Sequence, residues 1–223
     1  MGRRMAPLTL DTLPDLPKAS RRCVWWELDE VAGRRAAEAG YPDFEKEAWV
    51  STVLLQWGPC GRLVYVDEQA VGFVVYAPPE YVPRQADAFP TSPASADAVL
   101  LTTGWIEPAF RGEGLARMLV QGAAKDLTRR GVKAVECFGG GPAAVGGDGD
   151  DRDAHQHGDP CVLPAHLLES VGFTVVRPHH RYPRLRLDLK TAISWREDVE
   201  QALERLLGSV RVPVLTGVAP APS

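Results

Sequence analysis

The sequence predicts a mixed α/β fold built on one sheet, and three features of the chain lead to that prediction. The 223 residues are 45% hydrophobic, which is enough to bury one sizeable core. An apolar run at 98–106, a helical stripe after Gly114 and a β-rich run at 133–138 form a strand–helix–strand unit long enough for a right-handed parallel crossover. Two β-rich runs at 62–66 and 70–77 add an antiparallel hairpin. We therefore expect helices packed on a sheet that has both parallel and antiparallel strands.

Composition narrows the class of protein. Lys and Arg number 25 against 29 Asp and Glu, so the formal net charge is -4. This balance gives little reason to expect binding to nucleic acid and slightly favours a cationic partner. No apolar run approaches the roughly 20 residues that cross a bilayer, and no apolar stretch follows the two arginines of the opening MGRRMAPLTL. We therefore expect a cytoplasmic protein that does not span a membrane.

The cysteines predict neither a zinc site nor a disulfide scaffold. They lie far apart and lack CxxC spacing, so reduced thiols are the expected state. The four are Cys23, Cys60, Cys137 and Cys161.

The N-terminal third predicts one strand followed by two helices. Its run RCVWWEL, at 22–28, is rich in aromatic and β-branched residues and is expected to be a strand with Trp25 and Trp26 on opposite sides. Residues 29–40 are rich in Ala, Arg and Glu and end on glycine, which is typical of a helix. The stretch 43–57 places its apolar residues near one face, which predicts a second helix.

The middle of the chain alternates strands, a loop and a helix. The runs 62–66 and 70–77 have a connection of hairpin length between them. Five prolines in 78–97 predict a long surface loop. The strand at 98–106 is so continuously apolar that both of its sides should be buried. The helix that follows has an apolar stripe and is expected to stop at Gly131.

The rest of the chain predicts the end of a main domain and an extension. Residues 163–173 are expected to form a short helix, followed by two last strands. A Ser-x-x-Glu capping box then begins an amphipathic helix, and the final residues look disordered. We expect a main domain at 1–190 and a helical extension with a disordered tail at 191–223. The extension's helix either packs on its own domain or forms a homodimer.

The stretch 139–160 has almost no large apolar side chain and predicts a solvated insertion. Its acidic and histidine residues suggest a metal site, but a metal needs ligands held by a scaffold, so we expect no metal. The residues concerned are Asp148, Asp150, Asp151, Asp153, His155 and His157.

Residues 108–119, PAFRGEGLARML, place two glycines where a strand gives way to a helix. The first N–H groups of a helix have no internal partner and bind anions. Gly112 and Gly114 lack the Cβ that would hold a large anion away from these groups, while Arg111 adds positive charge. The simpler alternative is a glycine turn that merely joins two elements. The pattern is neither GxxxxGK[ST] nor GxGxxG, which disfavours a P-loop and a Rossmann site.

The stretch IEPAFRGEGLARML resembles motif A of the GNAT superfamily, the acetyl-CoA-dependent N-acetyltransferases. That motif is Arg or Gln, two residues, Gly, one residue, then Gly or Ala, and a hydrophobic-x-Pro-x-aromatic run usually precedes it. The order of predicted elements from about residue 20 to residue 190 also resembles the family's layout. The residues that match are Ile106, Pro108, Phe110, Arg111, Gly114 and Ala116.

This resemblance implies a mostly antiparallel mixed sheet whose central parallel pair is splayed for acyl-CoA, with helices on both faces. It implies acetyl-CoA as the acyl-donor co-substrate and direct transfer, in a ternary complex, to an amine of a small molecule or a protein. Backbone amides at 112–117 would hold the pyrophosphate, and residues 104–106 would pair with the pantetheine arm. The implied binding residues are Gly104, Trp105, Ile106, Arg111, Gly112, Glu113, Gly114, Leu115, Ala116 and Arg117.

The resemblance leaves the acid–base chemistry open. The family commonly has a tyrosine four residues before the Gly of Gly-Phe, and this chain has Leu168 there. Cys161 stands where the family often has asparagine, either as a packed inert thiol or as a reactive one. Glu107 is the acid nearest the motif and is the candidate catalytic residue. Its rivals, and the possible proton donors of the last hairpin, are Glu27, Glu136, His179, His180 and Tyr182.

Two further expectations concern the acceptor and an alternative function. The loop at 78–97 and the helices at 29–40 and 43–57 are expected to shape the acceptor pocket, with one of the tryptophans at 25 and 26 lining it. The missing tyrosine leaves open a non-catalytic acyl-CoA-binding module with a regulatory role.

Overall fold

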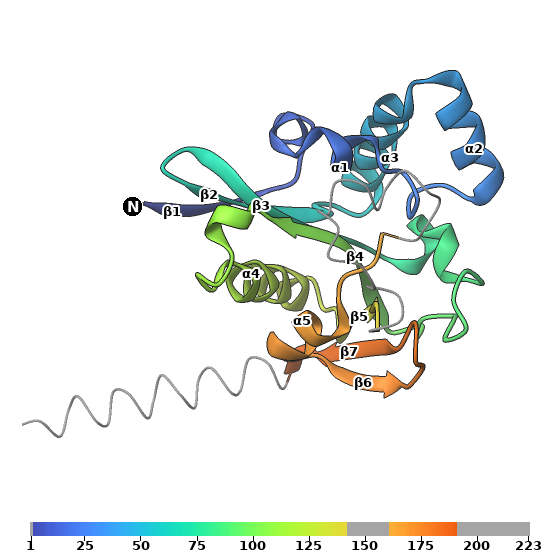
Figure 1. Ribbon diagram of the computed structural model, residues 1–223, viewed down its shortest axis with the longest axis vertical. Helices are drawn as coiled ribbons and strands as arrows, with labels where there is room; N and C mark the ends of the chain where they lie inside the picture. Colours follow the sequence, from blue (N-terminus) through green and yellow to red (C-terminus); the bar gives the residue numbers. More distant parts are fainter. Residues whose placement is uncertain (1, 142–160, 191–223) are drawn as a thin grey trace, which may run out of the picture.

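The computed structural model describes residues 2–141 and 161–190, in which helices cover both faces of a seven-stranded sheet (Figure 1). The strand order across the sheet is β1-β2-β3-β4-β5-β7-β6. The strands are β1 (Arg3–Pro7), β2 (Gly61–Val66), β3 (Gln69–Ala77), β4 (Ala98–Ile106), β5 (Ala134–Phe138), β6 (Thr174–Arg177) and β7 (Arg184–Asp188). The α-helices are α1 (Lys18–Arg22), α2 (Glu30–Ala39), α3 (Pro42–Gln56), α4 (Leu115–Arg129) and α5 (Ala165–Ser170).

The sheet of the described residues has one parallel pair, β4 and β5, among antiparallel neighbours. The two strands pair from Ala98 opposite Ala134 to Leu100 opposite Glu136. β4 then continues to Ile106 without pairing to β5, so the strands part beyond Leu100. This confirms the predicted mixed sheet with a splayed central pair.

A β-bulge lies at the point where the two strands part. In this antiparallel pair Leu101 is opposite Tyr76, and Thr103 is opposite Val75, the residue before Tyr76. Thr102 is therefore the extra residue of β4. The hydroxyl of Thr102 donates a hydrogen bond to the carbonyl oxygen of Val75 (3.2 Å). A bulge bends its strand and increases the local twist, which turns β4 away from β5.

Two apolar cores hold the helices on the sheet. α4 and α5 cover one face through a cluster that includes Leu119, Leu127 and Leu168. The region of α1 to α3 covers the other face through a cluster that includes Trp26 and Val53. Figure 1 shows α4 below the strands and α1 to α3 above them. Burying each leucine side chain contributes about 1.5–3 kcal/mol, so the apolar stripe of α4 fixes this helix and the turn before it.

The predicted strand at 22–28 is wrong. This stretch begins at the last residue of α1 and then forms a helix-like turn, in which the N–H of Leu28 donates to the carbonyl oxygen of Val24 (3.1 Å). Its apolar and aromatic residues reflect burial rather than strand pairing, since Trp26 is 1% exposed in the core under α3.

The first strand is instead β1, for which the sequence analysis made no assignment. β1 pairs with β2 at the edge of the sheet, with Arg3 opposite Val66. Four of its five residues are exposed. Because an exposed edge strand needs no alternation of apolar residues, its sequence carries no strand signal.

The other predicted elements in the described residues are confirmed. The hairpin is β2–β3, the two early helices are α2 and α3, and the loop at 78–97 holds two 3-10 turns, Pro79–Tyr81 and Pro83–Gln85. The short helix and the last two strands are also present as α5, β6 and β7. β4 is buried up to Thr102 and half-buried beyond it, so the expected burial of both sides holds for its first half.

Two predicted features lie outside the described residues. These are the possible metal ligands of 148–157 and the extension at 191–223, so the division into domains and the homodimer stay predictions. Within 2–141 and 161–190, no group of three or more His, Cys, Asp or Glu is placed to hold a metal ion. None of the helices in these two ranges is long and apolar enough to cross a membrane.

Candidate functional site

The turn between β4 and α4 is shaped by two glycines in the left-handed conformation. A 3-10 turn at Pro108–Phe110 precedes them. Gly112 has a φ of +83°, and Gly114, the N-cap of α4, has a φ of +80°. Residues with a Cβ rarely adopt such angles. A Cβ added at either glycine would meet no described atom within 4 Å, so side chains of the described residues leave the turn unfilled.

Six consecutive backbone N–H groups of this turn, from Gly112 to Arg117, have no hydrogen-bond acceptor among the described residues. The first bond of the helix runs from the N–H of Met118 to the carbonyl oxygen of Gly114 (3.1 Å). These donors lie at the positive end of the α4 dipole. The arrangement favours a bound anion with several acceptor oxygens.

The charged side chains of the turn are fixed by neighbours. The guanidinium of Arg3, on β1, donates to the Glu113 carboxylate (2.7 Å) and to the Glu113 carbonyl oxygen (3.2 Å). This ion pair neutralises the acid of the turn and ties it to the edge strand. Arg111 donates through Nε to the carbonyl oxygen of Ile106 (3.3 Å), and Arg117 donates to a carbonyl oxygen of α5 (3.1 Å).

β4 presents an open backbone edge beyond Leu100. β5 no longer pairs with it there, and in the described residues no backbone hydrogen bond joins 101–106 to the segment 161–165 that lies nearby. A Cβ added at Gly104 would lie 3.7 Å from Leu163 Cδ2 and 3.1 Å from a backbone oxygen of β3. The positions predicted to pair with a pantetheine arm, 104–106, therefore lie on an edge that leads from the splay to the glycine turn.

The segment before α5 takes the place beside β5 that β4 leaves. The N–H of Gly140, just past β5, donates to the carbonyl oxygen of Leu163 (2.8 Å), and the N–H of Ala165 donates back to Gly140 (2.8 Å). On the other side, the N–H of Gly141 donates to the carbonyl oxygen of Arg181 (2.8 Å). Three extended segments thus lie side by side at the carboxyl end of β5.

Two of the three acids suggested by the sequence are fixed in ion pairs. Glu27 is buried against the ammonium of Lys46, and burial raises its pKa above the usual value although Lys46 acts in the opposite direction. Glu136 is fully buried and pairs with Arg186 (3.2 Å). Glu107, half-buried at the end of β4, has a carboxylate with no ion pair or hydrogen bond in the described part of the chain.

Three other candidate positions have structural roles. Leu168, at the position of the family's tyrosine, is 1% exposed and belongs to the core beneath α4. The hydrogen bond with Cys23 and burial raise the pKa of Cys161, which is opposite to the activation expected of a reactive thiol. The Nδ1 of His179 accepts a hydrogen bond from the N–H of Tyr182 (3.0 Å) and so shapes the turn before β7.

An open hollow of about 590 Å³ lies beside the core that α1 to α3 cover. Its walls come from the turn after α1, from α2, from the loop at 78–97 and from the turn before β7. One of the two neighbouring tryptophans lines this hollow and the other is buried in the core, although they do not lie on a strand. The lining residues are Trp25, Glu30, Arg34, Arg84, Ala88, Arg181 and Tyr182.

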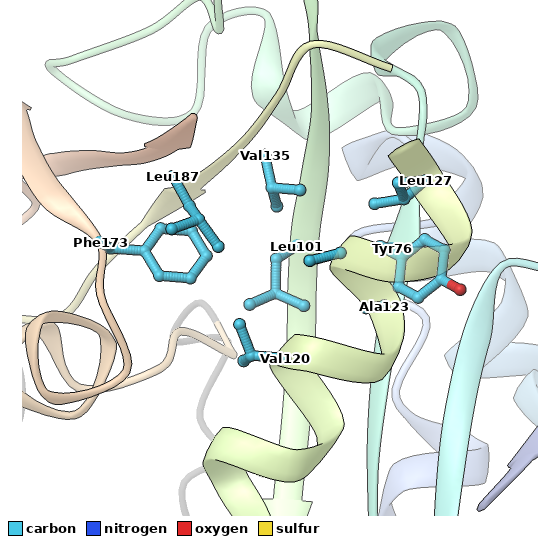
Figure 2. Close-up of a pocket in the computed structure, with 9 residues that line it drawn as sticks. Tyr76, Leu101, Val120, Ala123, Leu127, Val135, Phe173 and Leu187 are labelled. Atoms are coloured by element: carbon cyan, nitrogen blue, oxygen red, sulfur yellow. The ribbon is translucent and has the colours of Figure 1, made fainter. Parts of the chain in front are cut away.

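Figure 2 shows a second cavity, between α4 and the sheet, on which side chains of both converge. Its volume of about 10 Å³ is at or below the space that one water needs. The lining is almost entirely apolar, so this cavity is a packing gap of the core. The lining residues are Tyr76, Leu101, Val120, Ala123, Ala124, Leu127, Val135, Phe173 and Leu187.

Comparison with known proteins places this site in a family. Residues 18–145 match the model of the acetyltransferase (GNAT) family. The structure is similar to that of the PaiA N-acetyltransferase from Thermoplasma acidophilum in complex with coenzyme A, at 12% identity over 84% of this chain and 99% of that chain, with a TM-score of 0.51. It is also similar to the loading GNATL domain of CurA from Lyngbya majuscula, at 12% identity over 86% and 100% of the two chains, with a TM-score of 0.51. No protein with a curated description matches the sequence.

The splayed parallel pair and the glycine turn that follows it define an acetyltransferase fold of the GNAT type. The family match spans more than half of the sequence, so this chain belongs to the acetyltransferase (GNAT) family. The two similar structures, at this low identity, support the fold alone.

Proposed function

We propose that this protein is an acyl-CoA-dependent N-acyltransferase that uses acetyl-CoA and transfers the acetyl group directly to an amine in a ternary complex. The observation that carries the proposal is the row of six N–H groups beside two glycines at the start of α4. A diphosphate needs several donors and a close approach to the backbone, and this turn offers both. Family membership and the coenzyme A complex of the PaiA enzyme support the same reading.

In this proposal the turn holds the pyrophosphate of coenzyme A through its amides and Arg111. Glu113 contributes its backbone, since Arg3 holds its side chain. The pantetheine arm pairs with main-chain groups of β4 at Gly104, Trp105 and Ile106. A side chain at Gly104 would crowd β3, because its Cβ would lie 3.1 Å from the Phe73 carbonyl oxygen and 3.1 Å from Val74, whereas its 3.7 Å distance to Leu163 is an ordinary contact.

Acetyl-CoA supplies an activated acyl thioester, and the protein supplies position and proton transfer. Main-chain N–H groups of β4 near the bulge at Thr102 are the proposed donors to the acyl oxygen, because pairing with β5 has ended there. Glu107 is the proposed acceptor of the amine proton, since Glu27 and Glu136 are held in ion pairs. Glu107 lies five residues along the chain from Thr102, about 16 Å at the rise of an extended strand, so the amine proton reaches it through intervening waters rather than directly.

Titration calorimetry with acetyl-CoA tests the proposal, and α4 offers a matched pair of variants. Gly114 and Gly131 have φ values of +80° and +77°, and neither has a described atom within 4 Å of an added Cβ. They flank opposite ends of the same helix. We expect Gly114→Val to weaken acetyl-CoA binding at least about tenfold and Gly131→Val to leave it unchanged, since backbone strain is common to both. A wild-type protein that binds no acyl-CoA would overturn the proposal.

The second candidate function is a non-catalytic acyl-CoA-binding module, and the core position of Leu168 favours it because no tyrosine can act there. Both candidates predict binding of acetyl-CoA. They differ in turnover, which is measured as the release of free coenzyme A in the presence of a broad panel of amines. Binding without release from any amine would favour the module.

A further inference from the structure

We propose that the hollow lined by Trp25 and three arginines holds the amine acceptor by an anionic group, a carboxylate or a phosphate. This inference rests on the proposed function for the identity of the occupant as an acceptor. The presence of an anion site follows from the hollow itself. The net charge of the whole chain favours a cationic partner, and the local charge of this hollow reverses that expectation.

The hollow concentrates positive charge in an acidic protein. Arg34, Arg84 and Arg181 line it with one acid, Glu30, so its side chains carry two positive charges in excess. The chain as a whole carries a formal net charge of -4. Glu30 pairs with Arg34 (2.9 Å) four residues along α2 and also lies 4.0 Å from Arg84, so a single carboxylate serves two of the three arginines.

Two of the guanidinium groups have donors to spare. Arg181 is exposed and its guanidinium makes no ion pair or hydrogen bond within the described residues. The side chain of Arg84 is 19% exposed, its Nε is buried with no hydrogen-bond partner among the described residues, and the Glu30 carboxylate with which it pairs lies 4.0 Å away. A guanidinium is a rigid fork of five donors that fits the paired oxygens of a carboxylate or phosphate. An anion in the hollow would satisfy both groups.

Aromatic rings hold these arginines in place. The Arg84 guanidinium lies 5.0 Å from the ring centre of Trp25, and that of Arg181 lies 5.3 Å from the ring centre of Tyr182. Both rings pack edge-on against the buried Phe89, at 5.6 Å and 5.3 Å between ring centres. The walls are therefore anchored in the core. The volume of about 590 Å³ falls in the range of small-molecule sites, roughly 300–1,000 Å³.

The hollow lies close to the open edge of β4. Gly141, in the continuation of β5, forms a backbone hydrogen bond with Arg181. Gly140 forms one with Leu163, on the opposite side of the same segment. Two strand spacings of about 4.8 Å therefore separate the turn of Arg181 from Leu163, a total of about 10 Å. Leu163 in turn lies against Gly104. An acceptor whose anion is held in the hollow has its other end within reach of the splay.

Titration calorimetry with three small aromatic probes tests the inference. Phenylacetate and phenyl phosphate carry the two anions, and phenylacetamide is the neutral counterpart. We expect the anions to bind at least about tenfold more tightly than the amide, with an affinity that falls as salt is raised. Binding of one anion but not the other supports the inference and identifies the group recognised.

Variants locate the anion. We expect Arg181→Gln and Arg84→Gln each to weaken anion binding about tenfold, since each removes a charged donor. Arg181 is exposed, so its variant keeps the fold. Arg129→Gln, on the exposed last turn of α4, is the matched control and should bind both anions as the wild type does.

Equal binding of the amide and the anions, absence of anion binding, or an unchanged affinity in Arg181→Gln would overturn the inference. Acetyl-CoA binding is measured in the same samples and decides the proposed function separately. Loss of acetyl-CoA binding with anion binding intact would refute the acyltransferase and retain the anion site. The opposite result would refute the anion site alone.

Discussion

The sulfur atoms of Cys23 and Cys161 lie 2.7 Å apart, although 138 positions separate the two residues in the sequence. Cys23 is the C-cap of α1, and Cys161 lies in the segment that runs beside β5 toward α5. The indole N–H of Trp26 donates to the carbonyl oxygen of Cys161 (2.7 Å) and holds this segment against the core. The contact therefore links the end of α1, close to the hollow lined by Trp25, to the segment next to the splay.

We expect this thiol pair to close into a disulfide with oxidised glutathione. One thiolate displaces glutathione to form a mixed disulfide, and the second thiol displaces the other glutathione, so the protein loses two hydrogen atoms. The raised pKa of Cys161 makes the reaction slow at neutral pH and faster as pH rises. Mass spectrometry after alkylation measures the loss. Cys60, whose pKa burial raises to about 12, is the internal control and should stay reduced. Oxidation of Cys60 before the pair, or no oxidation of the pair, would contradict this prediction.

The buried ion pair of Glu27 and Lys46 predicts a pH-dependent stability. The pKa of Glu27 is raised in the folded protein, so folding opposes its ionisation. This group therefore favours the fold below its usual pKa near 4.5, and that contribution is lost as pH rises through the folded value. Lys46→Met removes the compensating charge and should lower the free energy of unfolding by about 3–5 kcal/mol at neutral pH.

Urea unfolding at about pH 5 and about pH 8 measures the effect, and the loss in Lys46→Met should be smaller at the lower pH because Glu27 is then closer to neutral. The double variant Glu27→Gln/Lys46→Met should recover most of the loss, since it leaves no unpaired charge in the core. An equal loss at both pH values, or a double variant no more stable than the single one, would refute this account.

The ion pair between Arg3 and Glu113 predicts a modest effect on acyl-CoA affinity. Arg3→Ala frees a carboxylate beside the proposed pyrophosphate site, so we expect acetyl-CoA binding to weaken about threefold, in line with the small energy of an exposed pair. The double variant Arg3→Ala/Glu113→Gln should restore the wild-type affinity. Arg4→Ala, which removes the neighbouring pair with Glu68 on the same edge, serves as the control. Equal weakening in both single variants would show that the charge of Glu113 plays no part.

The sequence predicts the glycine turn well because its signal is local. Gly112 and Gly114 are needed for positive φ values, and the stripe that starts at Leu115 shows where the helix begins. Strand β1 is not predicted from the sequence because an exposed edge strand lacks the alternation of apolar and polar residues that marks a strand. The run around Trp26 misleads because apolar aromatic residues mark burial as strongly as they mark a strand.

The hollow lined by Trp25 and the three arginines could not be predicted from the sequence for a different reason. Arg34, Arg84 and Arg181 come from a helix, a loop and a turn that only the folded chain brings together. The same is true of the thiol pair. In contrast, the substitution of Leu168 for the family's tyrosine is visible in the sequence, and the structure adds that this position faces the core.

Glu107 gives the last prediction, which concerns the proton of the amine. We expect Glu107→Gln to lower kcat by about 100-fold or more, the usual range for loss of a general base, while acetyl-CoA affinity stays the same. The carboxylate has no ion pair in the described residues, so the substitution should not disturb the fold. Steady-state kinetics with calorimetry separates the two effects, and Glu68→Gln, on the hairpin between β2 and β3, is the control. A wild-type kcat in Glu107→Gln would show that Glu107 is not the proton acceptor. The proton would then go to solvent or to another group, because Glu27 and Glu136 are already paired with basic side chains.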